Sequence, residues 1–161
     1  MCPSPRGFRI LPASAGPWKS PTELSEPLGK GMICPACRAI ALTPVPYEGV
    51  IVEACDACGG YWLDGERLRH IIHARQVHFG RANCELIARQ PRSPGIPAGE
   101  VERQLSCPRC SCAMAVLNYA QDSGIIINRC PSCGGLWFDR GELDKVQMLV
   151  EGIADSLAED T

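Results

Sequence analysis

The chain has 161 residues, a formal net charge of −2, and unusually many glycines, prolines and cysteines (16, 14 and 11). This length suits one ordinary domain or two very small ones. Aromatic residues make up 6% of the chain and the hydrophobic fraction of 45% includes the cysteines, so the apolar core is small and we expect cross-links to stabilise the fold.

The cysteine count and the N-terminal sequence bear on the cellular compartment. Eleven cysteines cannot all pair in disulfides, and the first 20 residues carry prolines where a secretory signal needs an apolar run. No apolar stretch approaches the roughly 18 residues that indicate a membrane span. We therefore expect a cytoplasmic protein whose cysteines hold metal rather than form disulfides.

Composition divides the chain into four segments. The first is rich in proline and lacks apolar periodicity, which predicts a disordered tail. The sequence "MICPACRAIAL", which suits the start of a compact domain, begins at Met32, so Met1 and Met32 are both candidate initiators. The segments are the tail 1–31, a Cys-rich unit with a helix 32–79, a linker 80–105, and a second Cys-rich unit with a C-terminal helix 106–161.

The two Cys-rich units repeat one pattern. Each contains two Cys-x-x-Cys pairs, separated by 17 residues in the first unit and by 19 in the second. A β-branched run lies between the pairs, "GVIVEAC" or "GIIINRC", and predicts a strand. The turn signals "PYEG" and "QDSG" precede these runs, so each unit predicts a β-hairpin between its cysteine pairs.

Two Cys-x-x-Cys pairs at this spacing are typical of a four-cysteine zinc site. Zn²⁺ takes four thiolates tetrahedrally, and a full set leaves no open coordination position, so both sites are predicted to be structural. We expect two Zn²⁺ per chain, with an iron–sulfur cluster as the alternative cofactor. The predicted ligands are Cys34, Cys37, Cys55 and Cys58 in the first unit, and Cys107, Cys110, Cys130 and Cys133 in the second.

After its second cysteine pair, each unit reads Gly-Gly-x-Trp-x-Asp. The first glycine suits a tight turn with positive φ. The Trp is predicted to cover the zinc hairpin and the helix start, with an exposed anchor for a partner or a base as the alternative. The Asp is predicted to cap the helix. These residues are Gly59, Gly60, Trp62 and Asp64 in the first unit, and Gly134, Gly135, Trp137 and Asp139 in the second.

The second helix is predicted over residues 140–158 and carries an apolar stripe at steps of three and four. Asp139 and Glu142 have the spacing of a capping box. So small a ribbon offers the stripe few core partners, so we expect another protein or self-association to cover it, with packing inside the chain as the alternative. The stripe consists of Leu143, Val146, Val150, Ile153 and Leu157.

The pattern Cys-Pro-x-Cys … Cys-x-x-Cys-Gly-Gly-x-Trp-x-Asp-x-Gly-Glu-Leu resembles the transcription-factor-IIB-type zinc-ribbon family, a zinc finger, in two tandem copies. The first unit departs from it at "DGERL", where Arg67 stands at the position of Glu142. The resemblance implies zinc binding. We therefore predict a small metal-stabilised α+β fold of two zinc ribbons, each a zinc-clamped β-hairpin followed by an α-helix, after a disordered N-terminal tail.

The predicted function is structural zinc binding that presents a protein-interaction surface, as in a small regulatory or adaptor protein. One alternative is a nucleic-acid-binding zinc finger of transcription with Arg38, Arg109 and Arg129 as phosphate contacts; another is a zinc–thiol redox sensor using Cys112. Each Zn(Cys)₄ centre adds about −2 to an already acidic chain, which disfavours phosphate binding. No catalytic constellation stands out, so we expect no enzyme.

Overall fold

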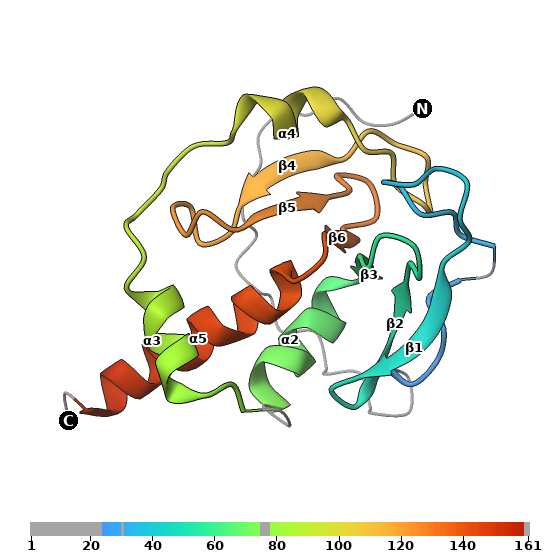
Figure 1. Cartoon of the computed structure of the whole chain (residues 1–161). Coiled ribbons are helices and arrows are strands. Elements are labelled where there is room, and N and C mark those ends of the chain that lie inside the picture. Colours follow the sequence, from blue (N-terminus) through green and yellow to red (C-terminus); the bar gives the residue numbers. More distant parts are fainter. Residues whose placement is uncertain (1–23, 30, 75–77, 160–161) are drawn as a thin grey trace.

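The computed structural model describes residues 24–29, 31–74 and 78–159 (Figure 1). Within them, six strands form one antiparallel sheet in the order β1-β2-β3-β6-β5-β4. The strands are β1 Thr43–Tyr47, β2 Val50–Ala54, β3 Tyr61–Leu63, β4 Ala115–Asn118, β5 Ile126–Arg129 and β6 Leu136–Phe138. The helices are α2 Gly65–Ala74, α3 Arg81–Ala88, α4 Ala98–Arg103 and α5 Glu142–Glu159.

Both predicted hairpins are confirmed. Strands β1 and β2 join through a two-residue turn in which Glu48 and Gly49 have φ values of 50° and 80°. Two left-handed residues twist a short turn in the sense that a hairpin requires. Strands β4 and β5 pair with Asn118 opposite Ile126, across a longer loop. We call residues 32–74, which include β1–β3 and α2, ribbon one, and residues 106–147, which include β4–β6 and the start of α5, ribbon two.

The two ribbons share one sheet because β3 pairs with β6. The register places Trp62 opposite Trp137, Tyr61 opposite Phe138 and Leu63 opposite Leu136. The sequence predicted two separate units, and the structure differs. Strands β3 and β6 are each the last strand of a ribbon, so each has a free hydrogen-bonding edge that only the other ribbon fills.

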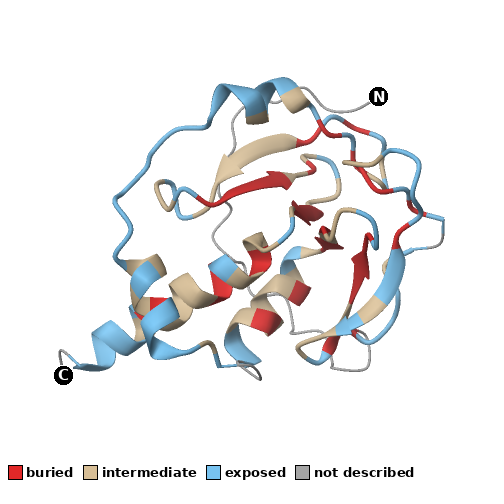
Figure 2. Cartoon of the chain, in the orientation of Figure 1, coloured by how far each residue is buried: buried red, intermediate tan, exposed pale blue. Residues whose placement is uncertain are grey.

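The sheet has a helix face and a zinc face, and both are buried near its centre (Figure 2). Successive strand residues point to opposite faces. Leu63, Leu136 and Phe138 therefore pack under α2 and α5 in one core cluster. Trp62 and Trp137 lie on the other face, in a second cluster with cysteines of both ribbons. The short central strands thus connect the metal sites to the helical layer.

The segment predicted as a linker contains two helices, and one of them is part of the core. Helix α3 packs on α5 at Gly152, where a Cβ atom would lie 2.8 Å from the carbonyl oxygen of Cys84 and 3.0 Å from Cβ of Ala88. Cys84 is only 1% exposed. The small residues at this crossing allow a close approach of the two helices, which composition alone did not indicate.

Residues just before Met32, predicted as the end of a disordered tail, are held by side chains of ribbon one. Leu24 is 2% exposed in the helix-face core. The Leu28 N–H donates to the buried Glu53 carboxylate at 3.0 Å, and Arg67 donates to the Glu26 carbonyl at 2.5 Å. A chain that starts at Met32 would lack these contacts. The rest of the predicted tail, residues 1–23 and Lys30, lies outside the described residues.

Helix α5 divides the predicted apolar stripe into two parts. Leu143 and Val146 are 1% and 0% exposed in the helix-face core, and Val150 is half-buried. Ile153 and Leu157 are 46% and 64% exposed. The first half of the stripe therefore packs inside the chain, which is the alternative that the sequence left open, and its second half stays exposed. Among the described residues no helix, α5 included, is long and apolar enough to cross a membrane.

Replacing Arg67 with Ala should lower the free energy of unfolding by about 3 kcal/mol or more, because its guanidinium is buried and bonds Asp64, Ile51 and Glu26. Denaturant unfolding of the zinc-saturated protein measures this change. Arg89→Ala is the matched control, since that side chain is 80% exposed, and should stay within about 0.5 kcal/mol. Equal effects of the two substitutions would contradict the assignment.

Candidate metal centres

In each ribbon, four cysteine sulfurs lie within 4.8 Å of one another. The Sγ–Sγ distances are 3.7 Å for Cys34–Cys58, 3.8 Å for Cys37–Cys55 and 3.7 Å for Cys107–Cys133. A tetrahedron with Zn–S bonds of about 2.3 Å has S–S edges of about 3.8 Å. Both donor sets therefore fit Zn²⁺. They contain the eight cysteines named from the sequence: Cys34, Cys37, Cys55, Cys58, Cys107, Cys110, Cys130 and Cys133.

Backbone N–H groups point at the sulfurs inside the Cys-x-x-Cys loops. The Cys37 N–H donates to Sγ of Cys34, and the Cys110 N–H donates to Sγ of Cys107, both at 3.3 Å. Burial raises the pKa of Cys34. At Cys55 burial also acts upward, but the N–H groups of Cys58 and Ala57 and the thiols of Cys34 and Cys58 together lower the pKa to about 7. Such N–H groups favour the thiolate form that zinc requires.

Each Cys-x-x-Cys loop ends in a residue with left-handed backbone. This residue donates its N–H to the carbonyl of the first cysteine of the pair at 2.8–2.9 Å. Gly59 and Gly134 have φ values of 75° and 74°, the conformation for which the sequence favoured glycine. Arg38 and Ser111 take the same position after the first pairs, with φ of 63° and 61°.

Trp62 and Trp137 are fully buried beside the ligand cysteines, at 0% exposure, so the alternative of an exposed anchor is wrong. The Trp137 Nε1–H donates to the Asp139 carboxylate at 3.2 Å. Trp62 Nε1 finds no hydrogen-bond partner within the part of the chain that the structure describes. Its corresponding acid, Asp64, is engaged by Arg67 at 2.7 Å.

The equivalent aspartates at the two helix starts make different hydrogen bonds. Asp64 caps α2 by accepting the Arg67 N–H at 2.9 Å. The Asp139 N–H donates to Glu142 at 3.1 Å, one half of a capping box. Its carboxylate instead accepts two bonds, of 2.6 and 2.7 Å, from Arg103 of α4.

Sequence reasoning missed Arg103, which lies in the predicted linker. The one signal was that Arg67 has no basic counterpart in the second helix. In ribbon one Arg67 pairs with Asp64, and in ribbon two Arg103 of α4 pairs with the equivalent Asp139.

These features define a protein with two structural zinc ribbons built on one sheet. The family described as "Transcription factor zinc-finger" matches residues 33–74 and 106–147, together just over half of the chain. The chain therefore belongs to the transcription-factor-IIB-type zinc-ribbon family and carries two tandem copies. No curated protein and no solved structure is significantly similar to it.

Native mass spectrometry of the chain is expected to show two Zn²⁺, and chelation should unfold the protein because the metal supplies much of its folding free energy. Cys133→Ser should weaken one site. Cys84→Ser should keep both ions, because Cys84 lies in α3 and donates to the Phe79 carbonyl instead. A chain that carries one ion or none, or an iron–sulfur chromophore, would overturn the assignment.

The buried Glu142 side chain should make the free energy of unfolding depend on pH. Burial raises its pKa from 4.5 to about 7, although the Asp139 N–H acts in the opposite direction. Because the folded state then holds the proton more tightly than the unfolded state, this contribution to stability is complete below about pH 4.5 and is lost as the pH rises through about 7. Glu142→Gln keeps an oxygen acceptor and cannot ionise.

The Glu142→Gln variant should therefore be more stable than the native chain by about 1–2 kcal/mol at pH 8, with the difference shrinking toward pH 5.5. Thermal unfolding of the zinc-saturated proteins across this range measures it. Glu102→Gln, at an exposed position of α4, serves as the control and should show no such trend. Parallel stability profiles for native and Glu142→Gln chains would refute the prediction.

Proposed function

We propose that the protein is a non-catalytic scaffold in which two zinc ions hold a surface for binding another protein, as in a small regulatory or adaptor protein. The closed Cys₄ geometry of both centres carries this proposal. With four thiolates on each ion, no coordination position is left for a substrate or an activated water. The metal then contributes folding free energy, which is on the order of 10–16 kcal/mol in zinc-finger peptides.

The candidate interaction surface lies where α3 meets the C-terminal half of α5. Ile153 and Leu157 are exposed one turn apart on α5. Large apolar side chains are costly to leave in water, and clusters of them on helices are common at sites where proteins dock. This surface keeps only the second half of the apolar stripe expected from the sequence.

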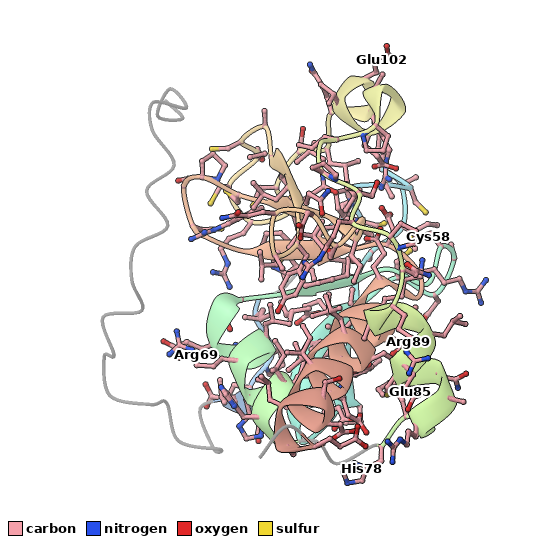
Figure 3. The ribbon with its side chains drawn as sticks, turned by 90° about the vertical axis from the view of Figure 1, so that its left-hand side faces the viewer. Cys58, Arg69, His78, Glu85, Arg89 and Glu102 are labelled. Atoms are coloured by element: carbon pink, nitrogen blue, oxygen red, sulfur yellow. The ribbon has the colours of Figure 1, made fainter. Side chains whose placement is uncertain are left out.

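The charged residues around this surface are largely paired with one another. Figure 3 shows Glu85 and Arg89 projecting from α3, with His78 near the same end of the molecule. Arg81 contacts Glu85 at 2.9 Å and also pairs with Glu159, while Arg89 lies 3.8 Å from Glu85. An apolar patch with a rim of mutually neutralised charges suits a protein partner better than a phosphate backbone.

The two other candidate functions receive less support. Of the arginines considered for phosphate binding, Arg129 is half-buried and Arg109, although exposed, donates to the Leu28 carbonyl at 3.2 Å, while Arg38 is exposed. The formal net charge of −2 also opposes phosphate binding. A redox sensor needs an accessible thiol, whereas Cys112 is 4% exposed.

A photo-crosslinking residue at position 157 of the zinc-loaded chain should trap one predominant protein in cells. The same residue at position 145 is the control, because Lys145 is exposed on the same helix but near its first turns. Ile153→Asp combined with Leu157→Asp should reduce recovery of that protein at least about tenfold, as expected for the loss of central apolar contacts, while zinc content stays at two. Unchanged recovery, or a complex that nuclease dissolves, would contradict the proposal.

A further inference from the structure

The second glycine of each Gly-Gly-x-Trp motif has a purpose that turn geometry does not explain. Gly59 and Gly134 have positive φ values, but Gly60 and Gly135, the residues after them, do not. What the second glycine provides is space. A Cβ atom on Gly60 would overlap the indole of Trp137, and a Cβ atom on Gly135 would overlap the indole of Trp62. Each tryptophan therefore rests on the glycine of the other ribbon.

These glycines belong to the loops that hold the second cysteine pair of each metal centre. The Gly60 carbonyl accepts the N–H of the ligand Cys55 at 3.0 Å, and the Gly135 carbonyl accepts the N–H of Cys130 at 2.8 Å. The Trp62 indole thus packs on the metal loop of ribbon two, and the Trp137 indole packs on that of ribbon one. We call this reciprocal arrangement the Trp–Gly interlock.

A third contact crosses between the ribbons at the same place. A Cβ atom on Gly59 would lie 3.1–3.3 Å from the side chain of Arg140, which follows β6 of ribbon two. The loop of the second cysteine pair in ribbon one is therefore contacted by two side chains of ribbon two, those of Trp137 and Arg140. Both indoles are at 0% exposure, so their burial depends on both loops holding their folded shape.

We propose that the two zinc sites are thermodynamically coupled through the Trp–Gly interlock, so that Zn²⁺ in either ribbon raises the affinity of the other. Zinc fixes the loop that holds the second cysteine pair of its own ribbon, and the tryptophan of the other ribbon packs against that loop. Without it, the tryptophan loses its apolar contacts, and the β3–β6 pair loses its packing. Coupling between two sites is reciprocal, and its usual range is roughly 5- to 150-fold.

Zinc affinities of three full-length chains test the coupling. The stepwise association constants of the native chain are obtained from native mass spectra in chelator-buffered zinc. Chains with Cys55→Ser and Cys58→Ser, or with Cys130→Ser and Cys133→Ser, give the constant of the single remaining site. The product of the two native constants, divided by the product of the two single-site constants, is the coupling factor, even when the sites differ in affinity. We expect at least about tenfold.

A substitution in the Trp–Gly interlock then tests whether the coupling between the zinc sites passes through it. Gly60→Ala should bring the coupling factor toward one while the chain still binds two zinc ions at saturation. Gly65→Ala is the control, because a Cβ atom there meets nothing within 4 Å, and it should leave the factor unchanged. If Gly60→Ala does not bind two ions, Trp62→Phe, which shortens the ring over Gly135, takes its place.

A coupling factor near one in the native chain overturns the proposal. So does a factor of tenfold or more that persists when the interlock is altered by Gly60→Ala or, in its place, Trp62→Phe.

Discussion

The packing of Trp62 and Trp137 across the β3–β6 pair is the interaction on which the rest of the structure depends. It joins two three-stranded ribbons into one sheet whose two faces are both buried at the centre. A single ribbon of about 40 residues would bury too little apolar surface to be stable without further support. The pairing doubles the core and places both metal centres on the face opposite α2 and α5.

The two copies have diverged in how they connect to the remainder of the chain. Ribbon one satisfies Asp64 with its own Arg67, which also reaches the Glu26 carbonyl. Ribbon two satisfies Asp139 with Arg103, so α4 is fixed to the start of the second helix. The segments before and between the ribbons are thereby fixed to the two copies, and each copy depends on residues outside the family motif.

Divergence is greatest at the end of the molecule away from the metal. Helix α5 has 18 residues whereas α2 has 10, and the added turns of α5 carry Ile153 and Leu157. Helix α3 packs on these turns at Gly152. The zinc sites and the Trp–Gly interlock are alike in the two copies, whereas the two copies differ most at their helical ends.

Local sequence by itself determined the ligand sets, the two hairpins and the helices after them, because cysteine spacing, β-branched runs and capping residues act over a few residues. Tertiary structure alone decided the β3–β6 pairing, the need for Gly60 and Gly135, the Arg103–Asp139 pair and the docking of α3. Each of these joins residues far apart in the chain, and three-residue strands are too short to show periodicity. The sequence motif therefore predicted the metal site. The need for its second glycine became clear only from the structure, where that glycine contacts the tryptophan of the other ribbon.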